Sequence, residues 1–435
     1  MKFSFALLIL LSPLAVLGQD TAPATTGTVT NPNPIVTLAG SFLEHNFFNF
    51  YAYGNGVYDT FAPIEQNGNF TNGGSFGYEV GGGVNGNHAF RNGNFSISYQ
   101  GGYRNYQSNL YGSGTYQNLG MSLVKRFSRR WTFSWTTGAG IYLYGGSFFT
   151  PEMNGSPSVV TNPFSSETRF FSTGVSVAYQ QTRHLSYVFS GNLFLQRYNY
   201  VGGIGSTGGT GSVGVQYRFA PRTSLGGGYS YSYYKYQHAA GQAKVQSVSL
   251  SLTHVFPDHW TATVSGGISH SDASGTTFIP VTLLIGNEAV GGYIVGNYRE
   301  VVWIPAFSGT LSHSLRRYLI SVTAGQGVSP SGNGYYLASR TDYLNGVVSR
   351  GFRRSNISGG VSYYRLTSVA NSVNASYITT SFSGSYGVNL MRYLGAFFRY
   401  DFNHYGALRP FNGTNDNRFS FGINFSSKSI PMTLF

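Results

Sequence analysis

The feature that most constrains this chain is an alternation of large apolar and small polar residues in stretches of about ten residues. From residue 131 onward, Trp131, Phe133 and Trp135 lie on one face of an extended chain, while Thr, Ser and Gly occupy the other face up to residue 140. The segments that start at 185 and 419 repeat the pattern. A period of two indicates β-strands with two different faces. The polar face is rich in Ser, Thr, Gly and Asn, which suits a concave wall on which side chains converge.

The composition favours a sheet that has lipid on one side and water on the other. Only 9% of the residues are charged and 17% are aromatic, whereas an average soluble domain has about 25% charged residues. The mean hydropathy is nevertheless only −0.11, so apolar and polar residues must be finely interleaved. A secreted soluble β-protein would need more charge on its surface and is therefore disfavoured.

The charge balance and the lack of cysteine exclude several function classes. The net charge is +13, but the Lys and Arg residues are spread along the chain and fall largely at expected turns. Together with the N-terminal export signal described in the next paragraph, this distribution argues against nucleic-acid binding. The chain has no cysteine, which excludes thiolate metal sites, thiol catalysis and disulfides.

The N-terminal region has the features of a targeting sequence. Lys2 is followed by an apolar run over residues 3–11 and by the small-residue site Val16-Leu17-Gly18. We therefore expect residues 1–18 to be a signal peptide. Residues 19–44 are rich in Thr, Pro and Asn without periodicity, and we expect them to be a flexible periplasmic segment. Residues 45–435 then form the folded domain.

Turns divide the folded domain into strands. Short basic turns, such as 125–130 and 352–354, alternate with longer Gly-, Ser-, Asn- and Pro-rich connections, such as 145–167 and 271–304. Short turns at one rim and long loops at the other are typical of membrane barrels. We predict an all-β fold, a single closed antiparallel barrel of about eighteen strands, or about sixteen as the alternative. An even count requires Phe47 to Asp59 to be the first strand.

With these features the chain resembles bacterial outer-membrane β-barrel proteins of the porin superfamily. In that family the last strand has apolar residues at alternating positions and ends in an aromatic residue. The barrel-assembly machinery recognises this pattern during insertion. The matching candidates for this insertion signal are Phe419, Phe421, Ile423, Phe425 and the final residue Phe435, although the segment 426–434, with Pro431, separates the last two. The resemblance implies outer-membrane lipid around the barrel and small hydrophilic solutes inside it. Trimers are common in this class, and the sequence shows no subunit interface.

Few charges fall on the predicted inner face. Projection of each strand puts Glu79, Arg104, Arg399 and Asp401 inward, near the seam where the first strand meets the last. Opposed charges there would create a transverse field that makes the pore selective. The alternative is a structural cluster of ion pairs that pins the seam.

The segment 271–304 is unusually apolar for an exposed loop. It either folds into the lumen as a constriction or plug, with Glu288, Arg299 and Glu300 near the aperture, or forms a hairpin that extends the wall.

We predict that the chain is not an enzyme and that it binds no cofactor or metal. Neither GxSxG nor HExxH occurs, and the His residues are scattered. The main hypothesis is an outer-membrane channel for passive diffusion of small hydrophilic solutes through a polar, mostly uncharged lumen. The alternative is a plugged structural or adhesive barrel with binding in its extracellular loops. The basic excess favours mild anion preference, and a neutral polar lumen suits sugars equally well.

Overall fold

The computed structural model consists of β-strands joined by turns. It describes residues 46–66, 69–106, 113–143, 149–150, 158–159, 167–198, 205–237, 241–285, 288–315, 318–329, 339–368, 376–406 and 414–427. The strands are β1 (Asn46–Gln66), β2 (Asn69–Phe90), β3 (Gly93–Tyr106), β4 (Gly114–Arg126), β5 (Trp131–Leu143), β6 (Phe149–Thr150), β7 (Ser158–Val159), β8 (Glu167–Gln180), β9 (Leu185–Tyr198), β10 (Ser206–Ala220), β11 (Thr223–Tyr236), β12 (Gly241–Val255), β13 (Trp260–Ile285), β14 (Glu288–Leu315), β15 (Tyr318–Ser329), β16 (Ser339–Gly351), β17 (Ser355–Ser368), β18 (Ser376–Asn389), β19 (Leu394–Gly406) and β20 (Thr414–Ser426). The predicted signal peptide, the periplasmic segment and Phe435 lie outside the described residues.

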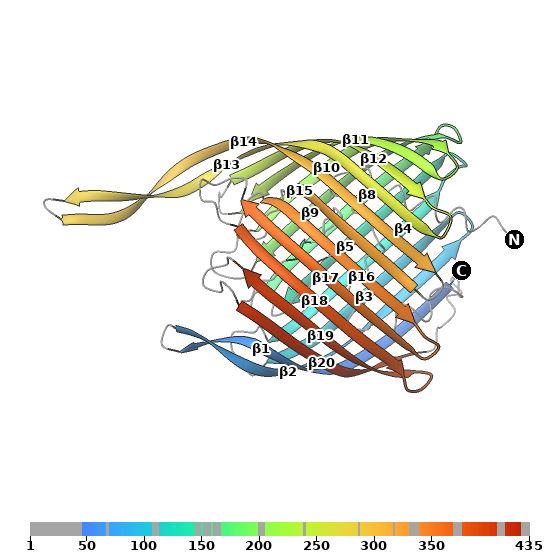
Figure 1. Cartoon of the computed structure of the whole chain (residues 1–435), viewed down its shortest axis with the longest axis horizontal. Helices are drawn as coiled ribbons and strands as arrows, with labels where there is room; N and C mark the ends of the chain where they lie inside the picture. The colour runs from blue at the N-terminus through green and yellow to red at the C-terminus, as the bar shows by residue number, and fades with distance from the viewer. Residues whose placement is uncertain are drawn as a thin grey trace.

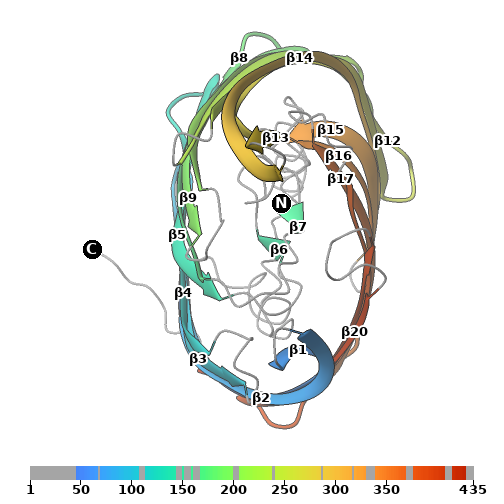
Figure 2. The ribbon, with the colours of Figure 1, turned by 90° about the vertical axis from the view of Figure 1, so that its left-hand side faces the viewer.

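Eighteen of these strands form one closed antiparallel barrel, as predicted. Each strand pairs with its neighbours in chain order, and β1 closes the barrel by pairing with β20, where Asp59 lies opposite Arg418. Strands β6 and β7 pair only with each other. The first strand covers the predicted segment from Phe47 to Asp59, so the parity argument is confirmed. Seen along its axis, the barrel wall is an oval ring (Figure 2).

The predicted alternation sets the two faces of the wall. Large apolar side chains point outward and are well exposed, for example Phe421 (68%), Leu250 (63%) and Val264 (61%). Among the described residues, no helix is long and apolar enough to cross a membrane. The ring is closed, so no sheet edge faces the surroundings along the barrel, and an apolar outer face combined with closure is the arrangement required of strands that cross a bilayer.

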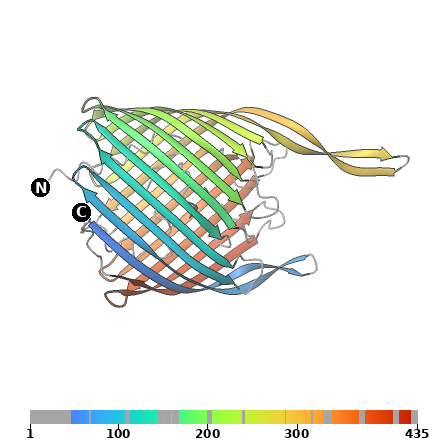
Figure 3. The same cartoon turned by 180° about the vertical axis from the view of Figure 1, so that it is seen from behind.

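The two rims differ in the way that the sequence predicts. The turns that the structure describes in full all lie at one end of the barrel (Figure 3); they are 91–92, 127–130, 181–184, 221–222, 256–259, 352–354 and 390–393. At this rim the guanidinium of Arg350 lies 4.7 Å from the ring centres of both Tyr318 and Phe352. A cation beside aromatic rings is typical of the boundary between membrane and water.

The hairpin β13–β14 dominates the opposite rim. Its strands pair without a break from Trp260–His313 to Ile285–Glu288. The described pairing with β12 ends at Gly275, and that with β15 ends at Phe307. The hairpin therefore projects beyond the barrel, as Figure 1 shows in gold. Of the two alternatives for residues 271–304, the structure has the hairpin that extends the wall.

Candidate functional site

Paired hydroxyl groups line much of the inner wall. Ser190 and Ser212 lie 2.6 Å apart through their Oγ atoms, and the Oγ atoms of Ser362 and Ser381 are also 2.6 Å apart. Further cross-strand hydroxyl pairs are Ser96–Ser122, Ser247–Ser269, Ser265–Ser308, Thr253–Thr263, Thr310–Thr323 and Ser358–Ser385. Each pair satisfies part of its own hydrogen-bonding capacity and keeps further acceptor sites. The result is a neutral, polar surface.

Charges on the inner wall concentrate where the barrel closes. Strands β19, β20, β1, β2 and β3 carry the seam cluster, which we define as Asp59, Glu79, Arg104, Arg399, Asp401, Asp416 and Arg418. The other charged residues on inward positions of the described strand segments with placed side chains are Arg126 and Arg218, near the ends of β4 and β10, and Glu300, in the middle of β14. The predicted residues Glu79, Arg104, Arg399 and Asp401 thus all face inward at the seam.

Glu79 and Arg104 form one half of the seam cluster. They lie opposite each other on β2 and β3, and Arg104 Nη2 is 3.4 Å from Glu79 Oε2. Both side chains are almost fully buried, with exposures of 3% for Arg104 and 7% for Glu79. A buried charge pair needs further hydrogen bonds to offset its loss of water.

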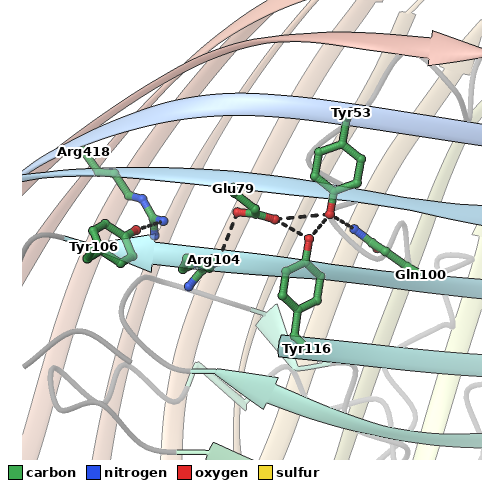
Figure 4. A network of polar contacts seen from close by, with 7 residues as sticks. All are labelled: Tyr53, Glu79, Gln100, Arg104, Tyr106, Tyr116 and Arg418. Atoms are coloured by element: carbon green, nitrogen blue, oxygen red, sulfur yellow. Dashed lines mark hydrogen bonds and ion pairs between the residues drawn. The ribbon is translucent and has the colours of Figure 1, made fainter. Parts of the chain in front are cut away.

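Two tyrosines and a glutamine supply those hydrogen bonds (Figure 4). Tyr116 donates to Glu79 Oε1 over 2.5 Å and Tyr53 donates to the same oxygen over 3.2 Å. The two phenol oxygens also contact each other, and Gln100 Nε2 donates to Tyr53 over 3.0 Å. Strands β1 to β4 are therefore connected through one carboxylate, which fixes the position of Glu79.

The other half of the seam cluster lies on β19 and β20. Arg399 holds Asp401 through Nε and Nη2, with Nε 2.7 Å from Oδ2 and Nη2 2.8 Å from Oδ1. Asp401 also lies opposite Arg418 in the β19–β20 register. The Arg399 side chain is 21% exposed, so this guanidinium remains accessible from the lumen.

Arg418 joins the two halves. It lies opposite Asp401 on one side and Asp59 on the other, and it is 7% exposed. Its Nη2 donates to the hydroxyl of Tyr106 on β3 over 2.5 Å, so the side chain reaches across β1 and β2. Asp416, on the same face, accepts a hydrogen bond from Asn403 over 3.2 Å. The closure thus has charge-assisted contacts as well as backbone pairing.

Glycines make room for the inward-facing tyrosines. A Cβ atom at Gly81 would lie 2.6 Å from the Tyr53 hydroxyl and 2.8 Å from the Gly101 carbonyl. A Cβ atom at Gly77 would lie 2.5 Å from the ring of Tyr106. The rings therefore lie against the wall over bare backbone, and part of the chain's high glycine content follows from this packing.

Replacing Gly81 by alanine is expected to lower the free energy of unfolding by about 1–3 kcal/mol. The added methyl group would displace Tyr53 and weaken its contact with Glu79. Urea unfolding of the detergent-folded barrel, followed by tryptophan fluorescence, measures this change. Gly54→Ala is the matched control because no atom lies within 4 Å of a Cβ at Gly54. Equal stability of the two variants would contradict the packing argument.

Sequence reasoning missed Asp59, Asp416 and Arg418. The alternation that places Phe419 and Phe421 outward also places residues 416 and 418 inward. This signal could have identified both residues. Tyr53 and Tyr116 could not have been paired in this way, because β1 and β4 are not neighbours in the sheet.

The candidate residues of the hairpin do not converge. Arg299 lies on its outer face and binds Asp272 through Nε (3.0 Å) and Nη2 (2.8 Å). Glu300 occupies the inward position opposite Ala273. Glu288 pairs with Ile285, and its side chain lies outside the described residues. The structure therefore does not bring these three residues to one aperture.

The last strand has the predicted pattern. Phe419, Phe421, Ile423 and Phe425 all point outward, with exposures between 38% and 68%. Their role as an insertion signal remains a prediction.

Histidines of the described strands lie on outward positions. His313 stacks on Trp260, and the ring of His270 lies tilted against Trp303, each with ring centres 4.5 Å apart. His404 contacts Asn415, also on the outer face. The described residues contain no group of three or more potential metal ligands. The lumen face thus has no described His that could act as a base for one of its many serines.

The fold and the site together define a transmembrane β-barrel with a polar lumen, in agreement with the predicted porin-like architecture. No family model and no curated protein matches the chain. Among solved structures, it is similar to OccK5 (OpdH) of Pseudomonas aeruginosa, with a TM-score of 0.43 and 10% identity over 88% of this chain and 98% of that one. It is also similar to a BenF-like porin from Pseudomonas fluorescens Pf-5, with a TM-score of 0.43 and 10% identity over 88% and 99% of the two chains. OccAB1 of Acinetobacter baumannii gives a TM-score of 0.42 and 12% identity over 89% and 98%.

Proposed function

We propose that this chain is an outer-membrane channel through which small hydrophilic solutes diffuse passively. The observation that carries the proposal is the series of paired hydroxyls on the inner wall, which spans strands from β3 to β18. Hydroxyl groups offer a solute replacement for the hydrogen bonds that it leaves behind in water. Because each contact is weak, the solute also departs readily.

The seam cluster would act as a weakly selective charged strip along this neutral wall. It contains four carboxylates and three guanidinium groups, so its formal charge nearly cancels. Many of the remaining cations lie in short turns or on the outer face, away from the path of a solute. We therefore expect less anion preference than the net charge of +13 implies. This balance suits neutral polyhydroxylated solutes such as sugars.

The proposal predicts stable conductance steps when the refolded protein is inserted into a planar bilayer. In a gradient of potassium chloride the reversal potential should lie close to zero, because cations and anions pass with similar ease. Liposome swelling in isotonic sugar solutions then tests neutral solutes directly. Protein that is folded in the bilayer but shows neither conductance nor swelling would contradict the channel and favour the plugged, adhesive alternative.

A further inference from the structure

Four exposed cations lie on the outer surface of the wall, on the strand pairs β8–β9 and β11–β12 that flank β10. We define this basic edge as Arg169 on β8, Arg197 on β9, Lys235 on β11 and Lys244 on β12. All four side chains are exposed, and all lie at the strand ends that face the long connections. In barrels of this class that rim faces the cell exterior. The basic edge is therefore at the level of the outer leaflet.

Two members of the basic edge oppose each other directly. Arg169 and Arg197 are register partners on β8 and β9. Like charges in direct cross-strand positions are destabilising unless a counter-charge lies between or beside them. Glu167 Oε1 lies 2.5 Å from Arg169 Nε and balances one of the two guanidinium groups. Within the described part of the chain, no carboxylate forms an ion pair with Arg197.

The lysines have little counter-charge either. Lys244 lies opposite Asp272, but that carboxylate is already held at both oxygens by Arg299. The cross-strand partners of Lys235 are Thr207 on β10 and Gln242 on β12, and both are neutral. The basic edge thus carries an excess of positive charge that this chain's described residues do not balance.

The outward side chains below the basic edge are suited to lipid tails. Along β11 the outward positions after Lys235 are Tyr233, Tyr231 and Tyr229, and then Leu225. Along β9, Arg197 is followed by Leu195, Leu193 and Phe189. The order of cation, then aromatic or aliphatic side chains, matches the order of headgroup and acyl chain in a lipid.

The opposite side of the barrel has no such patch. On β18–β20 and β1–β5, the described outward positions at this rim carry no Lys, Arg, Asp or Glu. Outer-face charge at this level therefore lies on β8 to β17, where Asp272 and Asp342 are each held by an arginine, Arg299 and Arg340, and Arg365 is a further exposed cation. A general need to anchor the barrel in the headgroup layer would not produce this one-sided distribution.

We propose that the basic edge binds phosphate monoester groups on a lipid of the outer leaflet. A monoester carries between one and two negative charges at neutral pH and has three acceptor oxygens, so it can serve both Arg169 and Arg197. Lys235 and Lys244 would neutralise a second phosphate on the same headgroup or on an adjacent lipid. The tyrosines and aliphatic residues below would contact the acyl chains.

The test measures how much lipid remains bound after detergent extraction. Wild-type protein is reconstituted in nanodiscs containing bis-phosphorylated lipid A, extracted, and examined by native mass spectrometry. We expect wild type to retain lipid A, and the variant R169Q/R197Q/K235Q/K244Q to retain it about tenfold less. The control R129Q/R130Q/R353Q/R354Q removes the same charge from the short-turn rim and should stay within about twofold of wild type.

Two further measurements decide between phosphate recognition and a general charge effect. Dephosphorylated lipid A and phosphatidylglycerol should both be retained less than the bis-phosphorylated lipid, since neither has a monoester. Equal retention of either lipid would overturn the proposal, as would undiminished binding by the quadruple variant or an equal loss in the control. If the quadruple variant fails to fold, Arg197→Gln and Lys235→Gln are tested singly, and each should weaken retention about threefold.

Discussion

Replacing Arg418 by methionine is expected to lower the free energy of unfolding of the barrel by about 3–5 kcal/mol. The buried guanidinium lies on β20 between Asp59 on β1 and Asp401 on β19, and it donates a hydrogen bond to the Tyr106 hydroxyl. Without it, these carboxylates lose their shared cation while remaining out of contact with water. Removal of one partner from a buried charge cluster lowers the free energy of unfolding by far more than the intact cluster contributes to it. The reason is that the remaining charges stay desolvated.

The measurement is urea unfolding in detergent micelles, together with the temperature at which the folded band disappears on a gel. Arg365→Met is the matched control, because Arg365 is exposed on the outer face opposite Asp342. Asp342 is already paired with Arg340, and even an exposed ion pair contributes only about 0–1 kcal/mol, so loss of Arg365 should cost little. If Arg418→Met proves no less stable than the control, the seam cluster does not stabilise closure.

The second prediction concerns the ions that pass the seam. Replacing Arg399 by glutamine is expected to raise the cation-to-anion permeability ratio by about twofold, since one charge at about 8 Å in water is worth about 0.5 kcal/mol. The Arg399 side chain is 21% exposed, more than those of Glu79, Arg104 and Asp401. Its loss leaves four carboxylates facing two guanidinium groups. Asp401 would still face Arg418, so the fold should survive the change.

Reversal potentials in a salt gradient measure this change. Arg365→Gln provides the control, since it removes the same charge from the outer face. The effect of Arg399→Gln should shrink as the salt concentration rises, because screening shortens the reach of the remaining carboxylates. An unchanged reversal potential at low salt would place the conduction path away from the seam, and the charged cluster would then be structural only.

The alternation of residue types was sufficient to predict the wall of this barrel. A period of two assigns each side chain to a face regardless of which strands are neighbours. The positions of Trp131 and Phe421 on the outer face were therefore predictable, as was the inward direction of Glu79 and Arg399. The even strand count and the closure also followed from the pattern and the first strand.

Contacts within the site were less accessible to sequence reasoning. The link between Tyr53 and Tyr116 depends on the height of β1 relative to β4, which is set by the stagger of the strands between them. The reach of Arg418 across two strands to Tyr106 depends on the same stagger. Arg299 was expected near an aperture, but its segment forms a hairpin that extends the wall, and there Arg299 lies on the outer face and binds Asp272.

The closure of β1 on β20 also constrains the order in which the chain can fold. The two strands of the seam are separated by nearly the whole sequence, and the hydrogen bond from Asn417 to Thr60 spans 357 positions. Contacts at such separation form late, because the intervening chain must first be organised before its ends can meet. Asp59 is synthesised well before its cation Arg418, which lies 359 positions further along the chain. A chain released before β20 is complete would retain an unbalanced carboxylate and an open edge, so the seam distinguishes finished from unfinished molecules.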